Sequence, residues 1–307
     1  MCYSAEVEED WKKFLRVTGA DMSLKDFYHI YWKRQSGQPF RMPRMLDRWF
    51  DGVAGDEAAE IRKLAAQWST EQITKFELQA FASRKRIADG ERALQVKVTK
   101  KAQDDVRIGN NKLLQAKEKL DYLKGIEPDP DYARIFPGWY APVVIVENSK
   151  RVVKPMRYLL RRAGARASDD EKYPGCYNAR RDNLERFWKG QFGHTHGITM
   201  ARKFYENVDR DGKNAILEFT PAGLDDMIVA CLYSRWVGED GEELLSFAAI
   251  TDEPPPEVAA AGHDRCIIPI KPEHIDAWLN PDPANLAAMQ AILDDRERPY
   301  YEHRLAA

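Results

Sequence analysis

A heptad spacing of apolar residues over residues 71–123 constrains the fold of this chain more than any other feature of its sequence. Two runs show the spacing: Ile73, Ala80, Ile87 and Leu94, followed by Val106, Leu113 and Leu120. Between them lies the stretch QVKVTKKA, in which Thr99 can cap a new helix. Small residues interleave with the second run: Ala102, Gly109 and Ala116. The pattern predicts two closely packed antiparallel helices over about 71–124, joined by a tight turn.

The charge on this hairpin does not by itself predict nucleic-acid binding. Residues 71–125 hold 13 Lys or Arg and 8 Asp or Glu, a net charge of +5. A solvated hairpin that packs on itself or on a partner explains this composition better than a clamp on DNA. The hairpin is therefore a candidate surface for a protein partner or for self-association.

The sequence changes character after the stretch GIEPDPDYARIFPGW, whose three prolines end the helical region. The next stretch, APVVIVENSKRVVKPMRYLL, is rich in β-branched residues and broken by the turn signal ENSK, so it predicts a β-hairpin. Further short strands are expected at 197–205, 214–219, 227–234, 244–251 and 265–270, and a helix at PEHIDAWL. The fold class predicted is α+β.

Composition excludes several classes of protein. The 307 residues carry a net charge of -2, so any nucleic-acid site must be a local one. No apolar run reaches the roughly 18 residues of a membrane span, and the acidic start EVEED does not resemble a signal peptide. Four scattered cysteines without a CxxC pair argue against a zinc site and a disulfide scaffold. We expect a cytoplasmic protein without metal or cofactor.

The chain begins MCYSAEVEED, with one of its four cysteines directly after the initiator Met. Aminopeptidases remove Met before a small residue such as cysteine. Removal would leave Cys2 with a free α-amine and a thiol on adjacent carbons, a 1,2-aminothiol that no internal cysteine offers. A simpler interpretation is an inert cysteine in a strand.

Three further stretches carry side chains suited to chemistry. These are Asn178 in YNARRDNLERFWKG, where a strand end precedes an expected helix, Glu206 in ARKFYENV, and His263 in GHDRCIIPI. Each has an ordinary structural explanation: a turn residue, a surface carboxylate and a hydrogen-bonded loop histidine. The pair His194 and His196 lacks a third ligand and makes a poor zinc site.

The order of these stretches resembles the SOS response-associated peptidase (SRAP) family, the abasic-site processing proteins. The resemblance rests on an N-terminal cysteine, then Asn-Ala-Arg at 178–180, Phe-Tyr-Glu at 204–206, His-Asp-Arg at 263–265, and WLNP. It implies a SRAP-like, mainly antiparallel β core with short helices, built from residues 1–8 and 136–300. Residues 9–135 would then form a large helical insertion that contains the hairpin.

The resemblance also implies a reaction and a substrate. An abasic site in single-stranded DNA is in equilibrium with an open-chain aldehyde, and an α-amine with a pKa of about 7.7–8.0 can condense with it. The neighbouring thiol then closes a thiazolidine, a covalent link between Cys2 and DNA. Glu206 would move protons during ring opening and loss of water, Asn178 would orient the amine, and His263 would act at the imine. Lyase activity through β-elimination is a further expectation.

Arginines would hold the phosphates that flank the abasic site. Residues 150–190 carry 12 Lys or Arg and 5 Asp or Glu, a local net charge of +7. The candidates are Arg180 and Arg265, together with Arg157 and Arg181.

The sequence departs from the family pattern mostly where DNA is expected. Tyr3 and Ser4 replace the usual Gly-Arg after the cysteine, and Tyr158-Leu159 replaces a Trp-Gly pair. Two other functions stay open on the sequence. One is a peptidase in which Cys2 is an N-terminal nucleophile, and the other is a non-enzymatic interaction protein that acts through the hairpin.

Overall fold

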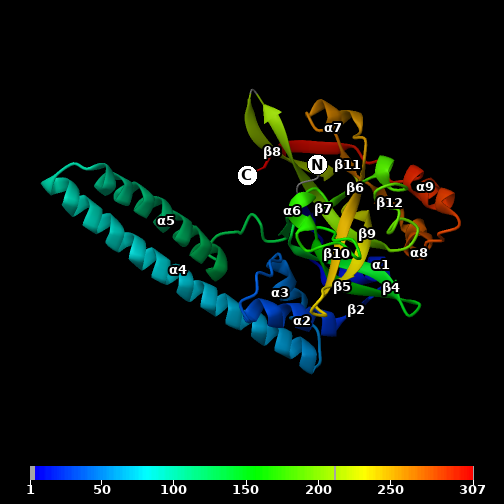
Figure 1. The fold of residues 1–307 in the computed structure, drawn as a ribbon, viewed down its shortest axis with the longest axis horizontal. Helices are drawn as coiled ribbons and strands as arrows, with labels where there is room; N and C mark the ends of the chain where they lie inside the picture. Colours follow the sequence, from blue (N-terminus) through cyan, green and yellow to red (C-terminus); the bar gives the residue numbers. More distant parts are fainter. Residues whose placement is uncertain (1–3, 211, 307) are drawn as a thin grey trace.

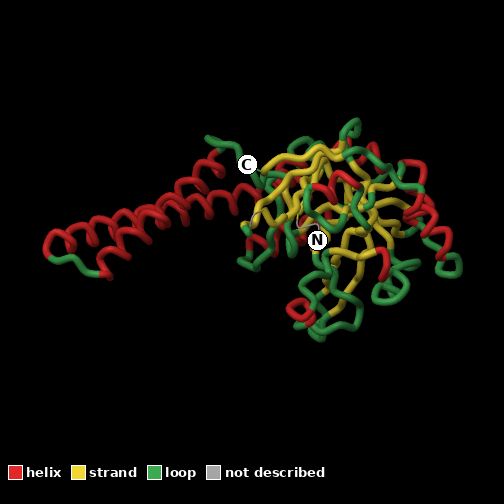
Figure 2. Tube along the Cα trace, turned by 90° about the horizontal axis from the view of Figure 1, so that it is seen from above, coloured by secondary structure: helices red, strands yellow, loops and turns green. Residues whose placement is uncertain are grey.

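The computed structural model describes residues 4–210 and 212–306, which form a β-rich body and a long helical arm (Figure 1). The arm consists of two helices that lie side by side and project away from the body. Figure 2, viewed from above, shows the same separation, with the strands confined to the body. The mixed α+β class expected from the sequence is confirmed.

Five strands of the body close into a barrel. They are β4 (Tyr140–Glu147), β5 (Lys150–Tyr158), β7 (His196–Arg210), β9 (Met227–Val237) and β10 (Glu243–Asp252). The ring runs β7-β9-β10-β5-β4 and back to β7, and only the β10–β5 pair is parallel. A closed ring satisfies the backbone groups that an open sheet would leave at its edges.

Further strands extend this ring. β1 (Ser4–Val7) lies between β7 and β3 (Arg134–Ile135), and β8 (Lys213–Pro221) lies between β7 and β13 (Tyr301–Leu305). The others pair with the ring at single strands: β2 (Asp21–Met22) with β5, β6 (Asn178–Arg180) and β11 (Cys266–Ile267) with β10, and β12 (Pro269–Ile270) with β9. These pairings bring residues from both ends of the chain onto one sheet.

The predicted β-hairpin at ENSK is confirmed by β4 and β5. Its two turn residues, Asn148 and Ser149, have φ of 51° and 61°. Positive φ at both central positions defines the turn whose twist matches that of the flanking strands. The strands predicted downstream are likewise present as β7 to β12.

Three helices before the arm pack on the body: α1 (Trp11–Thr18), α2 (Leu24–Gln35) and α3 (Met45–Trp49). Phe14, Phe27, Tyr31 and Trp49 are buried in the same apolar cluster as the barrel residues. The boundary of a helical insertion at 9–135 therefore remains a proposal. In its favour, β1 and β3 are paired with each other, and between them the chain returns to the sheet only at the two-residue strand β2 within the described residues.

The arm consists of α4 (Asp56–Val96) and α5 (Lys100–Lys124). As predicted, Thr99 caps α5: its hydroxyl oxygen accepts a hydrogen bond from the N–H of Ala102 at 3.2 Å. The small residues allow close contact, because a Cβ at Gly109 would lie 2.6 Å from Cγ1 of Ile87. α4 begins well before residue 71, because its first turns bury Ala58, Ile61 and Ala65 beside α2.

Short helices complete the body: α6 (Asp169–Lys172), α7 (Pro256–Ala260), α8 (Ile275–Leu279), α9 (Leu286–Asp294) and the 3₁₀ turn η2 (Pro272–His274). The prediction of a helix after Asn178 is wrong. A 3₁₀ turn covers only Arg181–Asn183, and turns follow, because the N–H of Trp188 bonds to the carbonyl of Asn183 five residues back.

Two apolar residues of this stretch, Leu184 and Trp188, are nevertheless buried. Among the described residues, no helix combines the length and the apolar character needed to cross a bilayer.

Candidate functional site

Glu206 and His263 form a buried acid–base pair. Oε2 of Glu206 lies 3.1 Å from Nε2 of His263, and the two side chains are 0% and 6% exposed. Glu206 comes from the middle of β7, and His263 from the loop that precedes β11. The ordinary interpretation of Glu206 as a surface carboxylate does not fit this burial. Two residues that are 57 positions apart in sequence thus meet in the interior.

The hydrogen bonds of His263 determine how a proton can be shared between its Nε2 and the Glu206 carboxylate. Its Nδ1 lies 2.9 Å from the carbonyl oxygen of Arg265 and 3.3 Å from the backbone nitrogen of Arg265, so it donates to the carbonyl when protonated and accepts from the N–H when not. With Nδ1 protonated, Nε2 either donates to the Glu206 carboxylate as imidazolium or accepts a proton from the Glu206 carboxyl. With Nδ1 unprotonated, the neutral imidazole donates from Nε2 to the carboxylate. Burial lowers the pKa of His263, and the Arg265 carbonyl offsets part of that effect. The neutral imidazole is therefore favoured near pH 7.

Asn178 lies on a strand adjacent to the end of β10. On β10, Thr251 pairs with Arg180 of β6 on one side and with Ile267 of β11 on the other. Adjacent strands lie about 4.8 Å apart, so β6 and the segment after His263 flank the same strand end. Within the described part of the chain, Nδ2 of the buried Asn178 and Oγ1 of the buried Thr251 have no hydrogen-bond partner.

Thr251 was missed by the sequence analysis. It is fully buried, and it shares one side of the sheet with Asn178 and Arg180. A threonine inside a strand-forming run carries no signal of its own, so the register of β6 on β10 was needed to find it.

The four arginines expected at phosphates differ in their availability. Arg157 donates to Asp170 at 2.8 Å and to the carbonyl of Leu159 at 3.0 Å. Arg181 contacts Asp252 at 3.3 Å and Asp294 at 2.7 Å. Both side chains are thus held within the body.

Arg180 and Arg265 are less committed. In the described part of the chain, the Arg180 side chain has one ion-pair partner, Asp182 at 3.1 Å, and it is 40% exposed. Arg265 contacts the adjacent Asp264 at 3.5 Å. They are the better candidates for a phosphate contact: Arg180 ends β6 and Arg265 directly precedes β11, and these two strands flank the end of β10.

Cys2 lies outside the described residues. The first described residue, Ser4, pairs with Tyr205, the neighbour of Glu206 on β7. The hydroxyl oxygen of Ser4 accepts a hydrogen bond from Nε of Arg134 at 2.8 Å. Arg134 also stacks on the Tyr205 ring, with 3.8 Å between its guanidinium carbon and the ring centroid. This buried cation beside β1 was also missed, since an arginine in a proline-rich linker gives no signal.

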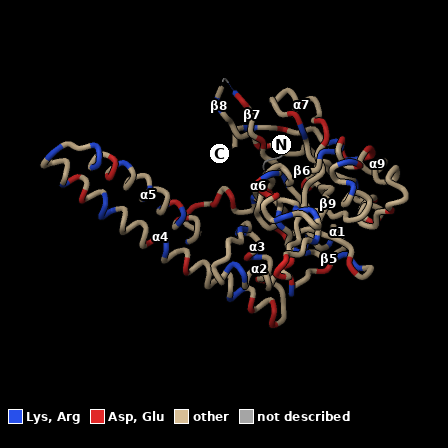
Figure 3. The backbone as a smooth tube through the Cα atoms, in the orientation of Figure 1, with Lys and Arg blue, Asp and Glu red and all other residues tan. Residues whose placement is uncertain are grey.

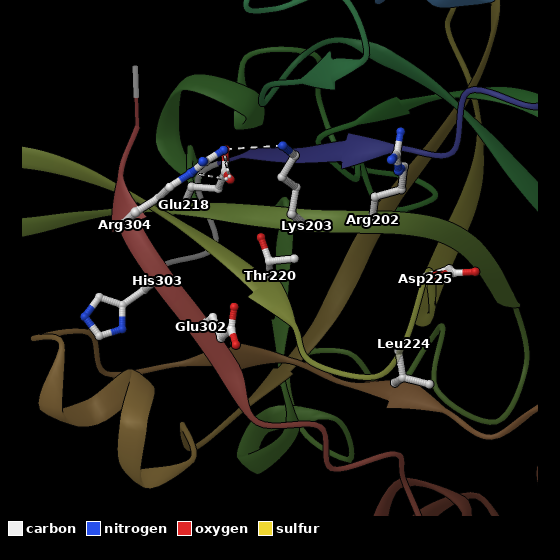
Figure 4. A pocket seen from close by; sticks show the side chains of 9 residues that line it. All are labelled: Arg202, Lys203, Glu218, Thr220, Leu224, Asp225, Glu302, His303 and Arg304. Carbon is white, nitrogen blue, oxygen red and sulfur yellow. Dashed lines mark hydrogen bonds and ion pairs between the residues drawn. The ribbon is translucent and has the colours of Figure 1, made fainter.

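A cavity of about 640 Å³ opens on the other face of β7 (Figure 4). Lys203 of β7 and Arg304 of β13 both contact Glu218 of β8 there, at 3.3 and 2.9 Å. Tyr205, which alternates with Glu206 along β7, also donates to Glu218, at 3.2 Å. Alternation thus separates a surface of paired charges from the buried Glu206–His263 pair.

His196 has a structural role. Its Nε2 accepts from the N–H of Gly193 at 2.8 Å, and its Nδ1 lies 3.0 Å from the carbonyl oxygen of Trp278. Burial lowers its pKa to about 3. Both ring nitrogens are used by the backbone, which leaves neither for a metal. Among the described residues no cluster of three or more His, Cys, Asp or Glu could hold a metal ion.

Comparisons with known proteins give one family and several similar folds. The family model described as SOS response associated peptidase (SRAP) matches residues 99–305. Two solved structures, one from Bordetella bronchiseptica and one from Bacteroides thetaiotaomicron, are 19% and 16% identical, both with a TM-score of 0.47. They cover 57% and 56% of this chain and 87% and 77% of their own. No curated protein matches the sequence.

Proposed function

The chain belongs to the SOS response associated peptidase (SRAP) family, and from this premise we propose that it cross-links itself to abasic sites in single-stranded DNA. The family description supports a role related to DNA damage. The observation that carries the finer proposal is the buried pair Glu206–His263, in which one proton can lie on either side of a 3.1 Å contact. Such a pair suits a reaction made of successive proton transfers.

Cys2 is the proposed reacting residue. Once Met1 is removed, its α-amine attacks the aldehyde carbon of the open-chain sugar to give a carbinolamine, which loses one water to become an imine. The thiol sulfur then bonds to the imine carbon, and its proton passes to the nitrogen. The five-membered thiazolidine that results links protein and DNA with the net release of one water.

Glu206 and His263 serve the proton steps of this sequence. The Glu206 carboxyl delivers a proton to the ring oxygen when the sugar opens and to the hydroxyl that leaves as water. The neutral imidazole of His263, favoured by its lowered pKa, takes a proton back at Nε2. Asn178 offers the N–H groups of a buried side-chain amide, one of which would orient the amine.

Arg180 and Arg265 are proposed to hold the flanking phosphates. They lie on either side of the end of β10, and among the described residues each has as its ion-pair partner an aspartate one or two positions away in the chain. Arg157 and Arg181, which were expected to share this task, are bound to carboxylates of the body. We assign these two a structural role around the site.

Aldehyde-bearing DNA tests the proposal. Purified protein is mixed with a uracil-excised single-stranded oligonucleotide and separated on a denaturing gel. A heat-stable band of protein plus DNA is the expected result, and the same oligonucleotide reduced by borohydride to the alcohol should give none. The family description also names a peptidase, in which Cys2 would cleave a peptide. Absence of the covalent band, together with cleavage of a peptide placed before Cys2, would favour that function.

A further inference from the structure

The arm, α4 and α5, packs on itself and leaves its outer surface unused. Its small residues face inward: Ala80, Ala102, Gly109 and Ala116 are buried. A Cβ at Gly90 would lie 2.9 Å from Cγ2 of Val106, so the two helices are in direct contact over this stretch. The result is a stiff rod that needs no partner to cover its heptad face.

The outer part of the arm carries more unpaired basic than unpaired acidic side chains. Over residues 84–107, three acidic residues are paired: Asp89 with Arg92, Asp104 with Arg107, and Asp105 with Arg86. Among the described residues, five cations of this stretch have no ion-pair partner: Arg84, Lys85, Lys97, Lys100 and Lys101. Glu91 is the remaining carboxylate. Figure 3 shows Lys and Arg at the extreme tip.

Two of these lysines lie at the helix end where a positive charge is unfavourable. Lys100 and Lys101 are the first two residues of α5, whose first turn contains no acidic side chain. The amino end of a helix carries a partial positive charge, so cations there weaken the helix. A pair of lysines at this position is a local cost to folding, which points to a use in binding.

The tip also lies far from the body. Arg34 of α2 stacks on Trp68, with 4.5 Å between its guanidinium carbon and the ring centroid, and this contact anchors α4 to the body. From Trp68 to Val96 the helix advances about 40 Å at about 1.5 Å per residue. That length equals about 12 base pairs of duplex at about 3.4 Å each. Val96 and Val98 at the tip are 89% and 69% exposed.

We propose that the tip of the arm, formed by Lys97, Lys100 and Lys101, is a second DNA-binding surface that contacts backbone phosphates of the duplex beside the abasic site. This inference rests on the proposed function, because it takes the DNA to be held at the Glu206–His263 site. The occupant follows from charge complementarity, since residues 84–107 of the arm hold five cations but only one carboxylate without an ion-pair partner among the described residues, and three of those cations are at the tip. The arm would then bind the duplex that flanks the lesion.

The test varies the length of flanking duplex from about 6 to about 30 base pairs, on one side or the other of a single-stranded gap. The gap carries a stable abasic analogue without an aldehyde, so that binding is measured at equilibrium. The variant is Lys97→Gln, Lys100→Gln and Lys101→Gln. The control is Lys12→Gln, Arg16→Gln and Lys25→Gln, which removes the same charge from exposed sites on α1 and α2.

Wild-type and control proteins should bind several-fold more tightly as the duplex on one side lengthens from about 6 to about 30 base pairs and reaches the tip. The tip variant should show no such gain, and the slope of log K against log salt should fall by about 2 to 3 relative to wild type. Retention of both the gain and the slope would overturn the proposal. So would a change from a larger assembly to a monomer with unchanged DNA affinity, which would make the tip a self-association surface.

The outcome is separable from that of the proposed function. All three proteins are also given a short single-stranded aldehyde oligonucleotide that cannot reach the tip, and all should form the covalent band. Failure of the wild type there contradicts the cross-linking proposal itself. A covalent band without any dependence on flank length contradicts only the assignment of the arm.

Discussion

Glu206 is the residue on which the proton chemistry of the proposed reaction depends. Glu206→Gln keeps the size of the side chain and a hydrogen bond to His263 but removes the transferable proton. We expect the rate of adduct formation to fall by about 10²- to 10⁴-fold, with unchanged affinity for DNA that carries the non-reactive analogue. Time courses on denaturing gels and an equilibrium binding assay measure the two quantities.

Glu218→Gln is the matched control for that change. Glu218 is also a buried carboxylate, but it lies on β8 among Lys203, Arg304 and Tyr205, on the other face of β7. Its loss should lower stability and leave the rate of adduct formation close to that of the wild type. Equal losses of rate in both variants would show that Glu206 acts only by holding the fold.

His196 makes a second prediction, on the pH dependence of stability. Its pKa is lowered to about 3 in the folded protein, so the unfolded chain binds the proton first as the pH falls below about 6.5. The contribution of His196 is complete above that pH and is lost by about 1.4 kcal/mol per pH unit below it. Urea unfolding at several pH values between about 7.5 and 5 measures this slope.

His196→Phe removes the titrating group and keeps the ring between Phe192 and Trp278. At pH 7.5 the variant should be less stable by about 2 to 6 kcal/mol, because the N–H of Gly193 and the carbonyl of Trp278 each lose a partner. Its stability should fall less steeply below pH 6.5. An unchanged slope would show that His196 is not the group being titrated.

Single residues were predicted from sequence only where their chemistry stands out. Glu206 and His263 were found through their neighbours in the chain, and their contact supports the choice. Thr251 and Arg134 could not be found, because their importance comes from strand register and from a stacking contact with Tyr205. The roles of Asn178 and Cys2 stay predictions.

At the scale of elements, the contact between the arm helices can be tested at Gly109. In Gly109→Ala the clash with Ile87 should lower the stability of the arm by about 1 to 3 kcal/mol. The higher helix propensity of alanine offsets about 1 kcal/mol of that loss. Asn111→Ala, an exposed neighbour, should strengthen it slightly. Hydrogen exchange of arm amides measures both.

A second change at Ile87 separates packing from propensity. Ile87→Ala in the Gly109→Ala protein should restore part of the lost protection, because the new methyl group then has room. If Gly109→Ala alone protects the arm more than Asn111→Ala does, α4 and α5 do not make the close contact at Gly109.

Local patterns explain which elements were predictable. The heptads gave both arm helices and the cap at Thr99, and β-branched runs gave the strands of the barrel. The start of α4 at Asp56 was missed although Ala58, Ile61 and Ala65 already repeat at helical spacing. The helix expected after Asn178 was wrong because burial of Leu184 and Trp188 is achieved by turns.

For the whole molecule, the arm and the reaction site should be separable. Replacing residues 71–124 by a short linker removes the outer part of α4 and all of α5, together with the hydrogen bonds from Gln35 to Glu71 and from Arg44 to the carbonyls of Tyr122 and Leu123. We expect a folded body that still forms the covalent adduct with short single-stranded DNA at a rate near that of the wild type. A folded deletion protein that forms no adduct would show that the arm completes the site.

Closure of the barrel was beyond sequence-based prediction. It depends on β7 pairing with both β4 and β9, strands that lie before and after it in the chain. Such pairings leave no periodic signal. The same holds for the ion pairs that tie Arg157 to Asp170 and Arg181 to Asp252, which remove two arginines from the set expected at DNA.

The central claim is that both groups of an N-terminal Cys2 react, and blocking the amine tests it most directly. One added residue before Cys2 leaves the thiol intact but converts the α-amine into an amide, which cannot condense with an aldehyde. The extended protein should give no heat-stable band with uracil-excised DNA. Cys2→Ser, which keeps the amine, should give a band only after borohydride treatment. A heat-stable cross-link formed by the extended protein would contradict the thiazolidine mechanism.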